Sequence, residues 1–112
     1  MNLRLKKVNE LIKQEVGNII IRELDIDREI LITITKAEVS ADLRYADVLV
    51  SVLPSEKKQS TLRSLNKNVY SLQQKLNKKL TMKPVPKIRF KLDTAGEYVS
   101  RIDEVIREIH GE

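Results

Sequence analysis

The chemistry that stands out in this sequence of 112 residues is a long series of cationic side chains without a carboxylate among them. Residues 57–92 hold eleven lysines and arginines and no Asp or Glu, whereas the remainder holds ten basic and sixteen acidic side chains. Ammonium and guanidinium groups concentrated in this way favour binding to phosphates and other polyanions. Lysines that only solvate a helix and a sheet edge are the alternative, but a segment this long without a compensating carboxylate favours a polyanionic partner.

Residue types that serve catalysis or cofactor binding are scarce. The one histidine, His110, cannot build a histidine-based triad or metal cluster, and its place before Gly111 is typical of a helix end. The absence of cysteine excludes disulfides and thiolate metal sites. Glycine occurs at three separate positions, so no glycine-rich phosphate loop exists. The sequence predicts a protein that is not an enzyme and carries no metal or other cofactor.

Aromatic side chains that could stack on bases are few. Phe90 and Tyr98 fall on apolar faces, whereas helical geometry places Tyr70 off the leucine positions of its helix. Tyr70 could stack on a base or pack over neighbouring lysine stems. If nucleic acid is the partner, we therefore expect contacts mainly to phosphates and to overall shape.

The periodicity of apolar residues predicts the elements that position these groups. A helix over residues 3–23, capped by Asn2, has apolar residues at spacings of three and four: Leu5, Val8, Ile12, Val16, Ile19 and Ile20. Alternating, β-branched segments at residues 30–40 and 45–53 predict two strands, and the turn between them makes a hairpin.

A long helix follows Pro54, and its apolar positions are Leu62, Leu65, Val69, Leu72, Leu76 and Leu80. Arg63, Lys67 and Lys78 fall on the opposite side of this helix. Residues 87–93 predict a third strand with inward Ile88, Phe90 and Leu92 and with outward Lys87, Arg89 and Lys91. The positive surface is therefore expected to continue from helix to sheet.

A last helix is expected to open at a capping box formed by Thr94 and Glu97. Its buried side would hold Tyr98, Ile102, Val105, Ile106 and Ile109. The chain then reads as one α+β domain over residues 1–112, in the order helix, strand, strand, helix, strand, helix, with helices packed on one face of a three-stranded sheet. No stretch is long and apolar enough for a membrane span, and a cytoplasmic location is expected.

Three blocks follow one another along nearly the whole chain: RLKKVNELIKQEVGNIIIREL, ILITITKAEVSADLRYADVLVSVL and LNKKLTMKPVPKIRFKLD. Their most specific positions are Ser40, Asp42, Leu43, Ala46, Val48 and Val50, and then Pro86, Ile88, Phe90 and Asp93. In type, order and spacing these blocks resemble ribosome-binding factor A, a family of bacterial assembly factors for the small (30S) ribosomal subunit.

The resemblance implies a type-II KH-like fold and binding to free or immature small subunits through 16S rRNA. It also implies assistance in late maturation and 5′-end processing of 16S rRNA, a part in growth at low temperature, and no catalysis. The expected partners are the small subunit and its rRNA, with no membrane, no small-molecule substrate and a monomeric protein.

One departure from the family pattern concerns the long helix. The family usually has alanine, any residue and glycine where this helix kinks, and the aligned residues here are Asn68, Val69 and Tyr70. Asn tolerates unusual backbone angles, but Val and Tyr do not. The helix is therefore either straighter in this chain or kinked by another route.

Candidate RNA-binding residues follow from the charge pattern. The first group, on the long helix and just beyond it, is Arg63, Lys67, Lys75, Lys78, Lys79 and Lys83. The second group, which has acidic neighbours in sequence, is Arg4, Lys6, Lys7 and Arg44. The third group, Lys87, Arg89 and Lys91, could extend the patch or could discourage edge pairing of the sheet.

An alternative from a different class is a basic protein-interaction module, or a ribosome-associated factor that acts through ribosomal proteins. Binding to RNA should weaken steeply with salt, whereas a mainly apolar protein interface would respond little.

Overall fold

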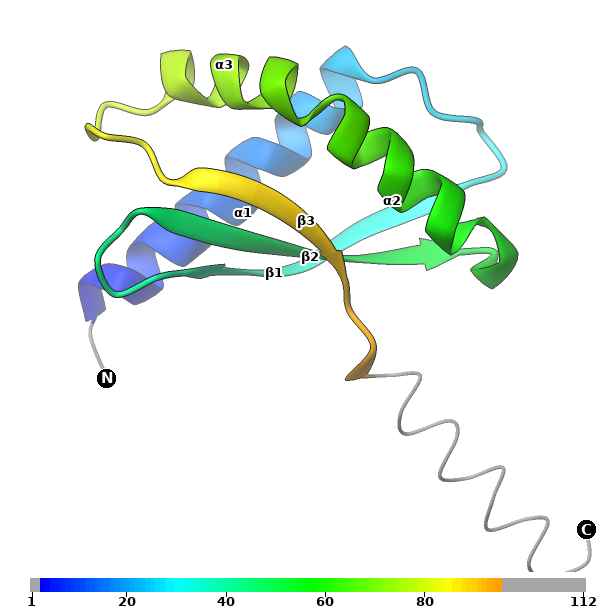
Figure 1. The fold of residues 1–112 in the computed structure, drawn as a ribbon, viewed down its shortest axis with the longest axis horizontal. Coiled ribbons are helices and arrows are strands. Elements are labelled where there is room, and N and C mark those ends of the chain that lie inside the picture. The colour runs from blue at the N-terminus through cyan, green and yellow to red at the C-terminus, as the bar shows by residue number, and fades with distance from the viewer. Residues whose placement is uncertain (1–2, 96–112) are drawn as a thin grey trace, which may run out of the picture.

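The computed structural model describes residues 3–95 and has the α+β architecture expected from the sequence (Figure 1). Its elements are α1 (Leu3–Glu23), β1 (Leu31–Val39), β2 (Tyr45–Leu53), a 3-10 turn (Ser55–Lys57), α2 (Lys58–Lys67), α3 (Val69–Lys79) and β3 (Lys87–Leu92). The bounds predicted for the first helix are confirmed. The predicted cap at Asn2 and most of the predicted last helix, including its buried side, lie outside the described residues.

The three strands form one sheet in the order β1-β2-β3. β1 and β2 are the antiparallel hairpin that the sequence predicts, and β3 runs parallel to β2 from the pair Tyr45 and Lys87 onward. A β-bulge lies between Ile34 and Lys36. Ile34 pairs with Val50, and Ala37 pairs with Val48. Residues three positions apart on a regular strand point to opposite faces, but the extra residue of the bulge lets Ile34 and Ala37 both point toward the core.

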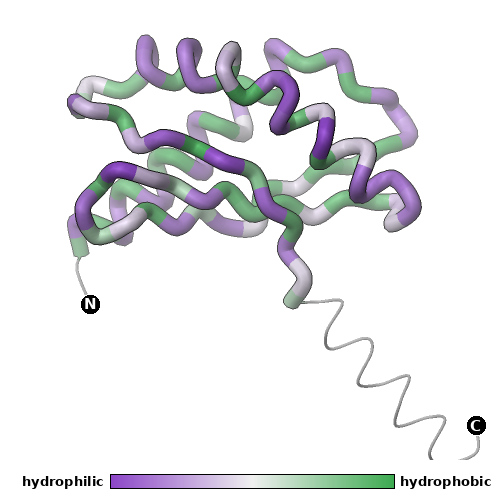
Figure 2. Tube along the Cα trace, viewed as in Figure 1, coloured by the Kyte–Doolittle hydropathy of each residue, from purple (hydrophilic) through white to green (hydrophobic). Residues whose placement is uncertain are grey.

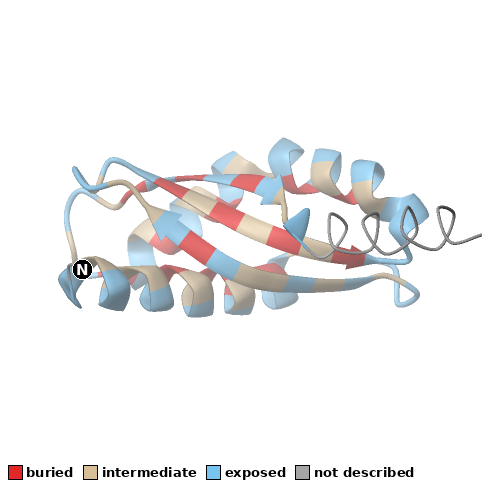
Figure 3. Cartoon of the chain, turned by 90° about the horizontal axis from the view of Figure 1, so that it is seen from below, coloured by how far each residue is buried: buried red, intermediate tan, exposed pale blue. Residues whose placement is uncertain are grey.

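All the described helices cover one face of this sheet. The inner face of β2 is its alternate residues Ala46, Val48, Val50 and Val52, each at most 1% exposed. The helices, β3 and the residue after α3 complete the core with Ile12, Val16, Ile19, Ile20, Leu65, Leu72, Leu76, Leu80, Ile88 and Phe90. The opposite face is seen in Figure 3, where buried and accessible residues alternate along β2 and β3. The predicted two-layer packing is thereby confirmed for the described residues.

The loop between β1 and β2 is a tight turn held by its own side chains. The Ser40 hydroxyl donates to Asp42 Oδ1 at 2.6 Å, and the same Asp42 oxygen accepts from the Arg44 amide at 3.1 Å. Leu43 has φ of 62°, the left-handed conformation that costs a side-chain-bearing residue about 1–2 kcal/mol. The residues Ser40, Asp42 and Leu43, which resemble the family pattern, therefore form this turn: the first two supply its hydrogen bonds, and Leu43 supplies its left-handed backbone.

The long helix of the sequence is broken at Asn68, which separates α2 from α3 (Figure 1). Asn68 has φ −98° and ψ 6°, and its amide N–H is shared between the Ser64 and Leu65 carbonyl oxygens, both at 3.2 Å. Its side-chain Nδ2 also donates to Ser64 O, at 2.8 Å. Of the two alternatives left by the sequence, the helix thus kinks by another route, through an asparagine instead of Ala-x-Gly.

The outer edge of β3 is closed by side chains from the two helices beside it. The Ile88 amide donates to Gln73 Oε1 at 2.8 Å, and the Phe90 amide donates to Asn66 Oδ1 at 3.4 Å. Gln73 Nε2 donates in turn to Pro86 O at 3.1 Å. The unpaired backbone groups at a sheet edge can pair with another strand, and here the side-chain amides of Gln73 and Asn66 bond to them instead. They also fix the distance between the helices and β3.

Candidate RNA-binding surface

The outer side of α2 and α3 is cationic because the inner side holds the leucines. Leu65, Leu72 and Leu76 are buried against the sheet, and helical geometry sends the residues between them outward. Figure 2 shows this alternation of hydrophilic and hydrophobic residues along the two helices. The exposed cations of this side, together with Lys83 in the loop after α3, are Arg63, Lys67, Lys75, Lys78, Lys79 and Lys83. We call these six residues the helix cations.

Most of the helix cations have no described carboxylate partner to neutralise them. Within residues 3–95, Lys75 is the member with an acidic partner, and its Nζ lies 4.0 Å from Glu23 Oε1 on α1. That distance is the outer limit of an ion pair, and both side chains are well exposed. The other five are therefore available to phosphate oxygens without first breaking a described salt bridge.

The cations of β3 do not form one surface with them. Ile88 and Phe90 face the helices, so Arg89 and Lys91 lie on the opposite, open face of the sheet. There both bind the carboxylate of Asp47 on β2, with Lys91 Nζ 3.1 Å from Asp47 Oδ2. The expectation that the positive surface continues from helix to sheet is therefore corrected for Arg89 and Lys91. Charge counted along the sequence could not show this pairing, because Asp47 reaches them only through the parallel register of β2 and β3.

The pKa of Asp47 is shifted in the direction expected for a carboxylate paired with two cations. Burial alone raises the pKa of its carboxyl group, but hydrogen bonds and charge interactions from Arg89 and Lys91 outweigh burial and hold the pKa below its ordinary value. Arg89 also lies over the ring of Tyr45, with its guanidinium carbon 6.0 Å from the ring centre. The open face thus carries cations that are already engaged.

The remaining predicted residues gather at one end of the molecule. The start of α1, the β1–β2 turn and the α3–β3 loop all lie at the left of Figure 1. The Lys87 amide donates to Arg44 O at 2.8 Å, so the second and third predicted groups meet there. Arg44 Nε lies 3.8 Å from Asp42 Oδ2. The exposed side chains of Arg4, Lys6 and Lys7 are on the first turns of α1.

A cleft opens between α3 and the loop that leads into β3. Its volume is about 660 Å³, and its walls include Tyr70 and Gln74 on one side and Lys83, Val85 and Lys87 on the other. Lys87 alternates with Arg89 and Lys91 along β3, but at the start of the strand it also lines this cleft, next to Lys83. The sequence analysis did not predict this cleft, because its two walls belong to separate segments that the fold and the hydrogen bonds of Gln73 bring together.

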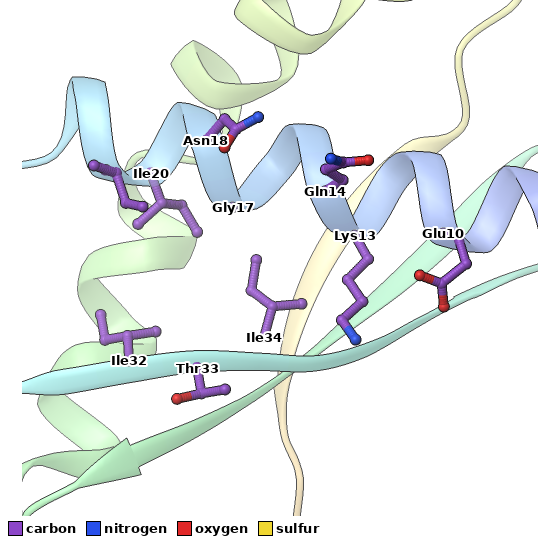
Figure 4. A pocket seen from close by; sticks show the side chains of 10 residues that line it. Glu10, Lys13, Gln14, Gly17, Asn18, Ile20, Ile32, Thr33 and Ile34 are labelled. Carbon is purple, nitrogen blue, oxygen red and sulfur yellow. The ribbon is translucent and has the colours of Figure 1, made fainter.

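A second cleft, of about 580 Å³, lies between α1 and β1 (Figure 4). Ile20, Ile32 and Ile34 supply apolar side chains to it, and its charged side chains are Glu10 and Lys13, both from α1. One cation balanced by one carboxylate is a poor phosphate site. Among residues 3–95, no group of three or more His, Asp or Glu side chains could hold a metal ion, and no helix is long and apolar enough to cross a membrane.

Comparison with known proteins gives the family and the fold of this chain. The sequence model of the family described as ribosome-binding factor A matches residues 4–106. The crystal structure of ribosome-binding factor A from Thermus thermophilus superposes with a TM-score of 0.69 at 22% identity, covering 81% of this chain and 97% of that one. The solution NMR structure of a Thermotoga maritima protein described as a putative ribosome-binding factor A gives 0.68 at 28% identity, covering 81% and 90%.

A third similar structure is the Thermus thermophilus ribosome-binding factor A homology model that was fitted into a cryo-EM map of a 30S complex of that protein. It superposes with a TM-score of 0.65 at 23% identity, covering 77% of this chain and 91% of that one. Structural likeness at this identity establishes the fold, and the match of the family model over most of the sequence establishes the family. The chain belongs to the ribosome-binding factor A family.

Proposed function

We propose that this protein is a non-enzymatic assembly factor of the small ribosomal subunit that binds 16S rRNA in free or immature subunits. The observation that carries the proposal is the set of helix cations on α2, α3 and the loop after α3, most of them without a described acidic partner, in a chain that belongs to the ribosome-binding factor A family. A member of that family has been fitted into a map of its complex with the 30S subunit.

The geometry suits binding to a phosphate backbone. Lysine ammonium groups are mobile point charges, and they accept phosphates in many orientations. Their anchor points are nevertheless fixed, because Leu65, Leu72 and Leu76 lock α2 and α3 against the sheet. The break at Asn68 turns the axis of α3 away from that of α2, so the cations follow a bent path. We infer that rRNA phosphates lie along this path.

The finer role, also a proposal, is assistance in late maturation and 5′-end processing of 16S rRNA, with a greater need for the protein at low temperature. Family membership supports it. Such a role requires binding and release only, so it calls for no catalytic residue. Cytoplasmic location and a monomeric state belong to the same proposal.

Co-sedimentation tests the proposal. Purified protein is mixed with free small subunits, large subunits and assembled ribosomes, alongside a Lys67/Lys75/Lys78/Lys79→Glu variant. We expect selective binding to small subunits that the variant loses. Equal binding to every particle, or to none, would refute the assembly-factor role. Binding that persists in the variant and at high salt would instead indicate contact through ribosomal proteins.

A deletion strain tests the finer role. We expect small-subunit rRNA with unprocessed 5′ ends to accumulate, more strongly in the cold, and to be cleared by the wild-type gene but not by the charge-reversal variant. Normal 5′ ends in the deletion strain would limit the function to binding.

A further inference from the structure

Tyr70 is an aromatic side chain in an unusual position. It is 76% exposed, although it stands on the first turn of α3 beside the helix break. Lysine stems do not cover its ring, so the packing alternative considered from sequence is not what the structure shows. Tyr70 also occupies the position at which the family pattern has glycine, and the ring is therefore a feature of this chain.

Tyr70 lines the cleft between α3 and the loop before β3 and is largely exposed there. Apolar surface inside the cleft comes from Val69, Val85 and Ile88, and its volume of about 660 Å³ is within the range of sites that bind small organic groups. An exposed aromatic face next to an apolar recess is the arrangement that stacks a planar, partly polar ring.

Polar groups in the cleft are suited to the edge of a base. Gln73 is engaged with Pro86, Asn77 and the Ile88 amide, so it holds the wall and is not free to bind. The Asn77 side-chain amide uses only its oxygen in these contacts, and the Gln74 side chain has no hydrogen bond within the described residues. Both amides offer donors, and Gln74 also offers an acceptor.

The two lysines that line the cleft indicate which kind of planar ring would bind there. Lys83 and Lys87 both line the cleft, and neither has an acidic partner within residues 3–95. An apolar recess with an aromatic platform and two flanking ammonium groups matches a base that is attached to its phosphates. A base in a duplex is stacked and paired, whereas a base in a single strand exposes its faces.

We propose that this cleft binds one unpaired nucleobase of single-stranded RNA, with its face on Tyr70 and its flanking phosphates at Lys83 and Lys87. A base site here presupposes the proposed binding to rRNA and deepens it. The helix cations supply affinity for any phosphate backbone, and the cleft adds a preference for an unpaired segment next to it.

Fluorescence anisotropy with labelled RNA tests the cleft. The probes are an adenine-rich single strand of about ten nucleotides and the same strand annealed to its complement. The variants are Tyr70→Ala and Tyr70→Phe, with Tyr45→Ala as the matched control, because Tyr45 is an exposed tyrosine on the open sheet face. Circular dichroism establishes that each variant is folded.

We expect Tyr70→Ala to weaken binding to the single strand by about tenfold or more and to leave duplex binding unchanged, while Tyr70→Phe and Tyr45→Ala behave as wild type. Unchanged single-strand binding by Tyr70→Ala, or an equal loss for both probes, would overturn the base site. The proposed function would survive that result if wild-type protein still binds small subunits, and it would fail separately if those subunits are not bound.

Discussion

At the scale of single residues, Asp47 decides how positive the open sheet face is. Its carboxylate takes up the charge of Arg89 and Lys91, and its side chain is only 21% exposed. Because its folded pKa lies below the unfolded value of about 3.9, the contacts stabilise the fold above that pH. The contribution is lost as the pH falls through the lower folded pKa.

We therefore expect Asp47→Asn to lower the free energy of unfolding at neutral pH by about 1 kcal/mol or less, since the partner cations are solvated. The deficit should shrink as the pH falls below about 4, where the wild-type carboxyl group is protonated as well. Urea unfolding at several pH values measures this. Asp25→Asn, at an exposed carboxylate without a described partner, is the control, and a deficit that grows in acid would contradict the assignment.

Thr61 gives a second prediction at this scale. It is a buried residue of α2 that is 6% exposed, and its hydroxyl has no hydrogen-bond partner within the described part of the chain. Thr61→Val keeps the shape and removes the unsatisfied hydroxyl, so we expect a gain of about 1 kcal/mol in the free energy of unfolding. Thermal unfolding beside the exposed control Thr33→Val measures it. A loss of stability would contradict the view that the hydroxyl is unsatisfied.

These residue contacts mark the limit of what the sequence can predict. The exposure of Arg89 and Lys91 follows from strand alternation, but their partner depends on which strand lies beside β3 and in which direction it runs. Thr61 was not among the predicted core residues because it is polar and sits one position before Leu62. Leu62, which was predicted to be in the core, is in fact only partly buried.

At the scale of elements, the attachment of α3 to β3 depends on Gln73. We expect Gln73→Leu to cost about 1–3 kcal/mol in the free energy of unfolding, because the Ile88 amide would lose its acceptor at the strand edge. Gln74→Leu is a matched control at the next position, where the side chain is exposed and has no described hydrogen bond, and it should change stability by less than about 0.5 kcal/mol. Chemical denaturation compares them, and equal effects would contradict this role.

Gly17 offers a test of how α1 packs on β1. It lies in the interior of α1, and a Cβ atom placed there would be 3.7 Å from Ile34 Cδ1, an ordinary contact. We expect Gly17→Ala to raise the free energy of unfolding by about 1 kcal/mol, because glycine is a poor helix former. Thermal unfolding measures the change. A decrease would show that helix and strand are closer than this spacing.

The elements themselves could be predicted well, and for physical reasons. Apolar spacing located α1 to the residue, and alternation located the hairpin and β3. The bulge after Ile34 and the break at Asn68 could not be predicted with the same certainty. Both are irregularities at single positions. Asn68 still donates to the Ser64 carbonyl oxygen four residues earlier, as in a continuous helix, so the leucine spacing runs through the break without marking it.

At the scale of the whole molecule, charge is separated by the sheet. The net charge of +5 says little, because the two faces differ. On the open face Lys36, Arg89 and Lys91 are paired with Glu38 or Asp47, whereas on the helical side Lys67, Lys78 and Lys79 have no described partner. We therefore propose that rRNA binds to the helical side alone.

The most direct measurement is the salt dependence of affinity for purified small subunits. It compares wild type with Lys67/Lys78/Lys79→Gln and with Lys36/Arg89/Lys91→Gln, which removes the same charge from the open face. Each lost phosphate contact lowers the slope of log affinity against log salt by about 0.7–0.9, so we expect the helix variant to lose about 2 to 3 and the sheet variant to keep the wild-type slope. An unchanged slope in the helix variant, or an equal loss in both, would contradict the assignment.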